Sequence, residues 1–206
     1  MWDTIARQLR HPSGRAGELI GCLMSALNRR SNRIAIEAMD IAPGETVLEL
    51  GCGYGSGIKS LARITRGGFV LGIDHSTTML AHAARRNVRS LRNRRVHLAL
   101  ARADALPCRS DSIDKILAVH MLYFAGLEVL REARRVLRPG GKLSVLVTDR
   151  ETMSAWKLAR AGIHRLFDQN DLAAFLREGG FIGQFSVTRI KLGFGASGLL
   201  AVATKS

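Results

Sequence analysis

The sequence predicts one α/β domain of the doubly wound class, with a mostly parallel sheet and a helical N-terminal extension. Short β-branched and apolar runs alternate with segments of helical periodicity through the middle of the chain. This alternation is typical of a parallel sheet whose right-handed crossovers place helices on both faces. The length of 206 residues, 47% of them hydrophobic and 23% charged, suits a single globular domain. We therefore expect one domain over 1–206, with a helical lid or extension over 1–40 and the α/β core over 41–206.

The N-terminal helices and the strands follow from local patterns. Apolar residues recur at helical spacing from Arg15 to Leu27, and a short helix is expected from Ser31 or Asn32 to Met39. Five strands are expected where buried apolar runs end at turn residues, over 46–50, 69–74, 96–101, 113–119 and 142–148.

Helices are expected between these strands and after the last of them. They run from a glycine-rich turn to about residue 66, and over 77–91, 127–137 and 168–177. Asp168 is a favourable N-cap for the last of these helices, with Asp171 at the capping-box position. Strands over 181–190 and 198–204 then follow each other, which predicts an antiparallel hairpin at one edge of the sheet.

Composition excludes several classes of protein. No apolar run approaches the roughly 18 residues that a membrane-spanning helix needs. The first residues carry an acid at Asp3 and no leading apolar block, which is unlike a secretory signal. Cys22, Cys52 and Cys108 form neither a CxxC pair nor a His-paired spacing. We therefore expect no disulfide framework, no metal site and a reducing, cytoplasmic location.

The charge balance is the outlying feature of the composition. The chain has 31 basic and 17 acidic residues, for a formal net charge of +14. Six arginines fall within the eleven residues from Arg85 to Arg95. A solvated surface is the default interpretation of such a run, and docking to an anionic membrane surface or to RNA is the alternative.

A glycine-rich turn follows the strand over 46–50, and it is the first candidate binding site. In an open α/β sheet the ligand lies beyond the carboxyl ends of the strands. Glycines there let a ligand approach the backbone. The segment from Glu49 to Gly57 lacks the glycine spacing of the dinucleotide fingerprint, and Glu49 would repel a pyrophosphate. The turn therefore favours a ligand less negative than a dinucleotide.

Two further carboxylates follow strands of the same sheet. Asp74 ends the strand over 69–74 and can accept two hydrogen bonds from a ribose diol; the alternative is an N-cap for the next helix. Asp104, after the strand over 96–101, can accept from an exocyclic adenine amino group; the alternative is a turn aspartate before Pro107.

Together these segments resemble class I S-adenosylmethionine-dependent methyltransferases. The matching segments are Val47–Gly55, Gly72–Asp74, Ala103–Pro107 and Leu130–Lys142, in the family's order, and the resemblance extends over about residues 35 to 206. It implies a Rossmann-like, seven-stranded sheet whose last strand is antiparallel, with S-adenosylmethionine as cofactor and S-adenosylhomocysteine as product. It also implies cofactor contacts at Glu49, Gly51, Cys52, Gly53, Asp74, His75, Met79, Asp104, Ala105 and His120.

The resemblance implies methyl transfer by in-line displacement, for which the protein mainly supplies proximity and alignment. A general base helps only when the nucleophile arrives protonated. His120, at the end of the strand over 113–119, is the first candidate base, and Tyr123 is the second. For both residues a packing or cofactor-contact role is the alternative.

The acceptor is the least determined part of the prediction. A small-molecule methyltransferase is the first hypothesis, and Arg150, Lys157, Arg160 and Arg165 are candidates for holding an anionic acceptor. A phospholipid or RNA methyltransferase that docks through its basic surface is the second. A non-catalytic cofactor-binding module is the third. The amphipathic N-terminal helix could cover the pocket or pair two subunits in a homodimer.

Overall fold

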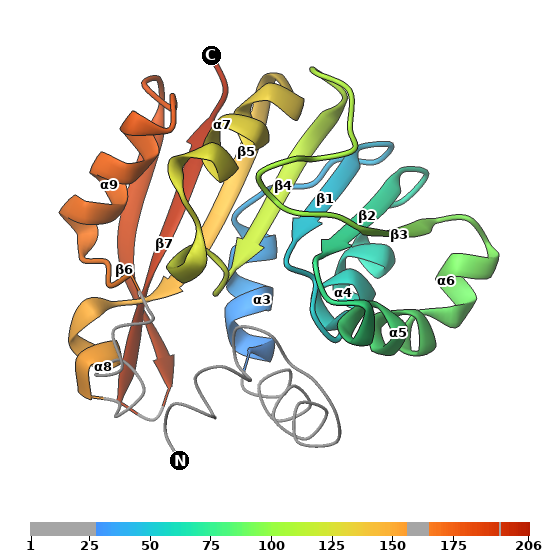
Figure 1. The fold of residues 1–206 in the computed structure, drawn as a ribbon, viewed down its shortest axis with the longest axis horizontal. Coiled ribbons are helices and arrows are strands. Elements are labelled where there is room, and N and C mark those ends of the chain that lie inside the picture. The colour runs from blue at the N-terminus through green and yellow to red at the C-terminus, as the bar shows by residue number, and fades with distance from the viewer. Residues whose placement is uncertain (1–27, 156–164, 194) are drawn as a thin grey trace.

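The chain folds around a seven-stranded sheet with the strand order β3-β2-β1-β4-β5-β7-β6. This computed structural model describes residues 28–155, 165–193 and 195–206. The first five strands pair in parallel, whereas β7 pairs antiparallel with both β5 and β6 (Figure 1). The strands are β1 (Thr46–Leu50), β2 (Phe69–Asp74), β3 (Val96–Leu100), β4 (Ile113–Val119), β5 (Leu137–Thr148), β6 (Phe185–Gly193) and β7 (Ala196–Thr204). The predicted fold class, the seven strands and the closing antiparallel hairpin are thus confirmed.

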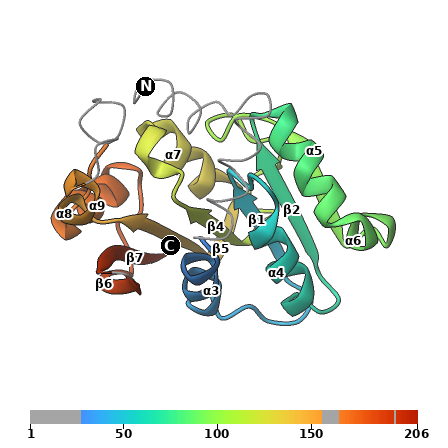
Figure 2. The same ribbon diagram turned by 90° about the horizontal axis from the view of Figure 1, so that it is seen from below.

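Helices cover both faces of the sheet (Figure 2). The helices are α3 (Arg29–Glu37), α4 (Ser56–Ile64), α5 (Thr77–Arg86), α6 (Val88–Arg92), α7 (Leu127–Val136), α8 (Arg150–Ala155) and α9 (Gln169–Glu178), with a 3-10 turn η1 (Leu122–Phe124). One core cluster lies under α3 and α4, centred on Ile36, Ile58 and Leu61. The other lies under α7 and α9, and includes Leu130 and Phe175.

The N-terminal extension is described only from residue 28 onward, so the helices expected before it lie outside the described residues. Helix α3 packs against the sheet, where the buried Ser144 hydroxyl donates to the Ala35 carbonyl at 2.8 Å. In the part of the chain that the structure describes, no helix is both long and apolar enough to cross a bilayer.

The helix predicted over 77–91 is two helices, and Asn87 is the reason. Its side-chain amide, which is buried, donates to the carbonyls of Ala83 at 2.9 Å and Gly55 at 3.0 Å. A side chain that bonds the last turn of its own helix competes with helix continuation. Helix α5 therefore ends at Arg86, and α6 begins at Val88 in a new direction.

Two strand starts also differ from the predicted positions. Strand β5 begins at Leu137, five residues early, because Leu137 pairs with Ile113 and the Gly140 amide donates to Lys205. Strand β6 begins at Phe185 rather than at Phe181, whose side chain is fully buried in the core after α9. In both places long-range packing, which local periodicity does not contain, decides the boundary.

Candidate cofactor-binding site

The candidate site lies where the parallel strands end. The arrowheads of β1, β2 and β4 point to one edge of the sheet, and α3 begins at that edge (Figure 1). Most of the residues predicted for the site follow the ends of these strands, so the topology brings them to one edge.

The glycine-rich turn after β1 has a backbone that only glycine adopts without strain. Gly51, Gly53 and Gly55 have φ angles of 67°, 49° and 72°. A Cβ on Gly55 would lie 2.7 Å from the Asn87 amide nitrogen and 2.8 Å from Ala83. The turn is therefore clamped against α5, which holds the backbone in place for a ligand.

Asp74 ties the end of β2 to this turn. Its Oδ2 accepts from the Gly53 amide and its Oδ1 from the Ser76 amide, both at 2.9 Å. The N-cap of α5 is Ser76, whose hydroxyl accepts from the Met79 amide at 3.3 Å. The alternative role of Asp74 as N-cap is therefore not the one observed. A carboxylate has about four acceptor positions, so two stay available for hydroxyl groups of a ligand.

Glu49 is the most perturbed acid of the site. It is 5% exposed, and a Cβ on Gly57 would lie 2.1 Å from its Oε1, so only glycine leaves room for it. Burial, helped by the nearby charge of Asp74, raises the pKa of Glu49 from 4.5 to about 8. Its Oε2 is buried and has no hydrogen-bond partner among the described residues.

The neighbours predicted to contact cofactor differ in exposure. Cys52 is buried, and burial raises the pKa of its thiol far above the usual range. Met79 is also buried, in the first turn of α5. The His75 side chain is 48% exposed, with Nδ1 3.7 Å from Asp74 Oδ1. Beside the turn, Cys52 and Met79 are thus packed in the interior, whereas His75 is accessible to solvent.

Asp104 and Ala105 lie in the loop after β3. Arg102 contacts both carboxylate oxygens of Asp104, with its Nε 2.8 Å from Oδ1. Hydrogen bonding to Arg102 holds the pKa of Asp104 below its usual range. Ala105 is exposed. The Asp104 carboxylate is thus ionised and forms an ion pair with Arg102.

His120 and Tyr123 form one hydrogen-bonded network. His120 directly follows β4 with a φ of 54°, which is strained for a residue other than glycine. Its Nδ1 lies 3.0 Å from the Tyr123 hydroxyl, and its Nε2 lies 3.0 Å from the Ser31 hydroxyl of α3. The Thr148 amide donates to the same Tyr123 oxygen. The network links α3, β4, η1 and β5 at one point.

Burial sets the protonation states of this network. Burial lowers the pKa of His120 from 6.5 to about 4 and raises that of Tyr123 above its usual range. Both groups are therefore neutral near pH 7. A neutral imidazole has one donor and one acceptor nitrogen, so each of its nitrogens has a protein partner here.

Sequence reasoning missed Ser31 and Asn87 as parts of the site. The position of Asn87 near the end of a helical pattern is a weak local signal, because asparagine often ends helices. The partner of Ser31 lies 89 residues away, so no local pattern indicates it.

Of the four cations predicted to hold an acceptor, two are described, and both have partners. Arg150 pairs with Asp168 at 2.7 Å and with Asp171, and Arg165 stacks over the Phe175 ring at 4.6 Å. Lys157 and Arg160 lie outside the described residues. No group of three or more potential metal-ligating side chains occurs within the described ranges.

The arrangement fits a cationic, ribose-bearing ligand. A buried carboxylate oxygen without a partner is costly unless a donor or a positive charge reaches it. An ammonium group beside Glu49 would satisfy that oxygen, and a ribose diol suits the remaining acceptor positions of Asp74. The exposed Gly51 follows Glu49 by two residues, and the Gly53 amide contacts Asp74, so the glycine turn joins the two carboxylates.

Fold and site together define an open α/β domain with a candidate ligand site at the carboxyl ends of β1 and β2. Residues 47–141 match the family model of a methyltransferase domain. This segment is therefore similar to a methyltransferase domain, and the sheet has the Rossmann-like methyltransferase fold.

Known proteins resemble this chain over slightly more than half of its length. The methyltransferase GfsG of Streptomyces halstedii is 42% identical over 113 residues, which cover 53% of this chain and 40% of that protein. A demethylmenaquinone methyltransferase of Bacillus mycoides (strain KBAB4) is 32% identical over 122 residues, covering 58% and 51%. The chain thus spans about two fifths to half of the length of these relatives.

The fold extends beyond the matched segment. A chain in the complex between the Haloferax volcanii Trm112 methyltransferase activator and the putative methyltransferase superposes with a TM-score of 0.77 and 19% identity. The superposition covers 92% of this chain and 94% of that one, so nearly the whole chain has the methyltransferase fold.

Proposed function

We propose that this protein is an S-adenosylmethionine-dependent methyltransferase that transfers the methyl group to a small-molecule acceptor. The observation that carries the proposal is the buried, unpartnered Oε2 of Glu49, two residues before the clamped glycine turn. In the proposed complex Glu49 binds the cofactor's amino group and Asp74 binds its ribose. The Gly51 and Gly53 backbone lies along the cofactor, with Cys52, His75 and Met79 as its neighbours.

The far side of the cofactor belongs to the loop after β3. We assign Asp104 and Ala105 to the adenine, the former through its carboxylate and the latter by apolar contact. The Arg102 pair leaves Asp104 ionised, which suits acceptance from an amino group. His120, at the end of β4, lies on the side of the transferred methyl group.

The bound cofactor supplies a methyl group on a positively charged sulfur, which needs no metal and no redox change to be transferred. Proximity and alignment are then the protein's main contributions. The Ser31–His120–Tyr123 network fixes the imidazole, and we propose that His120 lines the acceptor side of the site as a neutral, fixed ring. With a pKa near 4, His120 is a weak base at pH 7, so this site suits acceptors that do not depend on it for deprotonation.

A small-molecule acceptor is favoured by the matched relatives. A protein named for a demethylmenaquinone substrate is 32% identical over 122 residues of this chain. Docking on RNA or on a membrane surface, and a homodimer, stay predictions.

Calorimetric titration with S-adenosylmethionine and S-adenosylhomocysteine tests the proposal. Wild type should bind both, and Asp74→Asn should bind at least about tenfold more weakly, because a neutral amide accepts fewer hydrogen bonds than a carboxylate. Asp111→Asn is the control, since Asp111 is exposed and pairs with Lys205 away from the site. Wild type that binds neither compound, or Asp74→Asn that binds as wild type does, would contradict the proposal.

A further inference from the structure

A groove lined by cations separates α3 from α4. It has a volume of about 670 Å³, and the two helices lie next to each other on one face of the sheet (Figure 2). Six cationic side chains line it: Arg29, Arg30 and Arg33 from α3, Lys59 and Arg63 from α4, and Arg86 from the end of α5. The lining contains one carboxylate, Glu37, whose Oε1 lies 3.9 Å from Arg33 Nε.

Four of these six cations have no acidic partner among the described residues. Some arginines elsewhere have a close acidic partner, as in Arg135 with Glu132 at 2.6 Å and Arg189 with Asp149 at 2.8 Å. In the groove, Arg29, Arg30, Lys59 and Arg63 make no ion pair with any acid of the described ranges. Like charges that converge in a groove repel each other, and an anion bound between them relieves the repulsion.

One end of the groove adjoins the candidate site. Asn32 donates to the Ser56 hydroxyl at 3.2 Å, which joins the first turns of α3 and α4, and Ser56 directly follows the glycine turn. The neighbouring Ser31 contacts His120 at 3.0 Å. Both helices therefore begin at the ligand-binding edge, and α3 extends the groove about 12 Å away from it.

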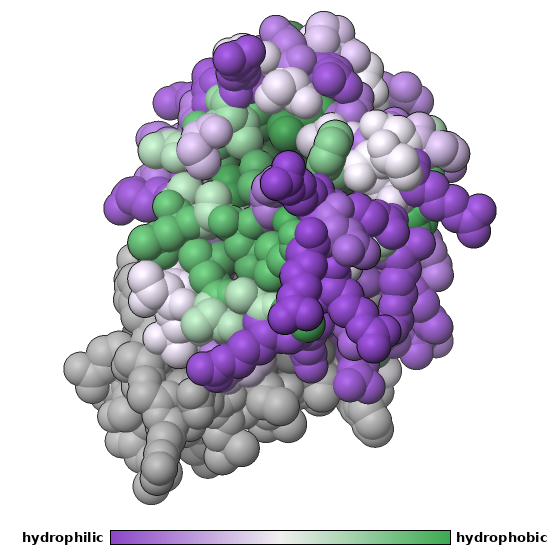
Figure 3. Space-filling model, turned by 90° about the vertical axis from the view of Figure 1, so that its right-hand side faces the viewer, coloured by the Kyte–Doolittle hydropathy of each residue, from purple (hydrophilic) through white to green (hydrophobic). Residues whose placement is uncertain are grey.

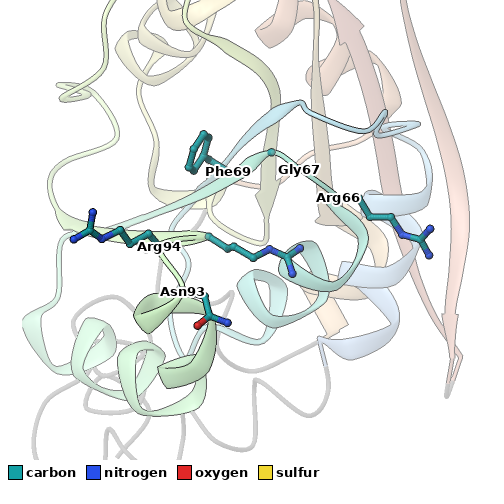
Figure 4. A pocket seen from close by; sticks show the side chains of 7 residues that line it. Arg66, Gly67, Phe69, Asn93 and Arg94 are labelled. Atoms are coloured by element: carbon teal, nitrogen blue, oxygen red, sulfur yellow. The ribbon is translucent and has the colours of Figure 1, made fainter.

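The other hollow of the basic surface lacks this convergence. It has a volume of about 480 Å³ and lies at the amino ends of β2 and β3. Arg66 and Arg94 point to opposite sides of it (Figure 4), and Arg95 donates to the carbonyls of Ala62 and Thr65 at the end of α4. The nearby edge of the sheet presents apolar surface beside a band of hydrophilic side chains (Figure 3). Of these two hollows, the α3–α4 groove is the one in which several cations without an acidic partner among the described residues line one space.

We propose that the α3–α4 groove binds the phosphate groups of the acceptor, so that the acceptor is a phosphate- or diphosphate-bearing small molecule. This inference rests on the proposed function in one respect, that the methyl donor lies at the adjoining edge. Arginine binds phosphate oxygens with paired N–H donors, and Lys59 adds a point charge. Phosphates held beside Arg29 and Arg30 place the remainder of such an acceptor near His120.

The shape of the groove favours a compact phosphate ligand over larger anions. A bilayer is flat and does not enter a groove between two helices. None of the twelve lining residues is aromatic, whereas single-stranded nucleic acid is usually bound by stacking on aromatic side chains. A length of about 12 Å suits a few phosphates rather than a polymer.

Titration of the full chain with pyrophosphate tests the assignment. The double variant Arg33→Gln/Arg63→Gln should bind pyrophosphate at least about tenfold more weakly than wild type, because two charge-assisted contacts are lost. The matched control is Arg131→Gln, an exposed arginine on α7 across the sheet, which should bind as wild type does. Binding of S-adenosylhomocysteine should be unchanged in both variants.

Every outcome decides between the proposals. No binding of pyrophosphate, or equal binding by wild type and the double variant, overturns the groove assignment. A 12-nucleotide RNA or phosphatidylglycerol vesicles that bind through the groove when pyrophosphate does not would replace it with a macromolecular partner. A wild-type protein that binds pyrophosphate but not S-adenosylhomocysteine would contradict the proposed function and still support the anion site.

Discussion

The carboxyl ends of β1 and β5 both present buried acids, but the surroundings of these acids differ. At the end of β5, Asp149 accepts from Arg189 at 2.8 Å, from the Thr152 amide at 2.8 Å and from the Ser197 hydroxyl. Burial acts to raise the pKa of Asp149, yet these hydrogen bonds and Arg189 outweigh it and hold the pKa below its usual range. At the end of β1, no cation of the described residues contributes to the pKa of Glu49, which rises to about 8.

The difference distinguishes an acid whose hydrogen bonds stabilise the fold, Asp149, from acids that we propose bind a ligand, Glu49 and Asp74. The bonds to Asp149 hold β5, α8 and the β6–β7 hairpin together, so its charge is satisfied within the protein. Glu49 and Asp74 lie at the same edge with acceptor capacity left over, and Glu49 is destabilising until a partner arrives. Perturbed acids of this kind are typical of functional sites.

The largest expected effect is the pH dependence of stability due to Glu49. The folded pKa of about 8 lies above the ordinary value of 4.5, so this group's contribution is complete below pH 4.5 and is lost as the pH rises through 8. Relative to Glu49→Gln, the free energy of unfolding of the cofactor-free wild type should fall by about 3.5 kcal/mol between pH 5 and pH 8. Urea unfolding at three pH values measures this, and parallel profiles for the two proteins would place a cation beside Glu49.

Removal of the Asp149 carboxylate should lower the stability of the fold without changing cofactor affinity. Asp149→Ala should lower the free energy of unfolding by about 3 kcal/mol, because the carboxylate is buried and its loss leaves the Thr152 amide unpaired and removes a partner from Arg189 and Ser197. Affinity for S-adenosylhomocysteine, measured by calorimetry, should change by less than about twofold. Lost affinity in a folded variant would assign the end of β5 to the cofactor site.

The clamped turn beside Glu49 should tolerate no side chain. Gly55→Ala should cost about 2 to 3 kcal/mol, because the new Cβ would meet Asn87 and Ala83 at under 3 Å in addition to the strain of a positive φ. Gly140 is the matched control: its φ is 77° with nothing within 4 Å of a Cβ, so Gly140→Ala should cost only about 1 kcal/mol. Equal thermal shifts in the two variants would show that the clamp contributes nothing.

The smallest effect is expected at the exposed Arg102–Asp104 pair. The Arg102 side chain is 76% exposed, so Arg102→Gln should leave the melting temperature unchanged. Because this frees both oxygens of Asp104, cofactor affinity should rise, by up to about threefold. A fall in affinity would mean that Arg102 itself contacts the cofactor.

The sequence alone was sufficient to predict the strands and the glycine turn, because buried apolar runs and positive-φ glycines have local signatures. Thr46–Leu50 and Ile113–Val119 were predicted to the residue. The break at Asn87, the early start of β5 at Leu137 and helix α8 were not predicted, since each depends on partners distant in the chain.

The site shows the same division. Glu49 and Asp74 follow strands, so their edge of the sheet was predictable, whereas the missing partner of Glu49 Oε2 appears only when burial is known. Ser31 and His120 are 89 positions apart in the chain, so no local sequence pattern could predict the hydrogen bond between them.

Proton release on cofactor binding tests the central claim most directly. At pH 7 a carboxyl with a pKa near 8 is mostly protonated, and an ammonium group bound beside it drives the proton off. Calorimetry of S-adenosylhomocysteine binding in buffers of different ionisation enthalpy should therefore detect close to one proton released by wild type and none by Glu49→Gln. Binding without proton release, or release that persists in Glu49→Gln, would contradict the assignment of Glu49 to the cofactor's amino group.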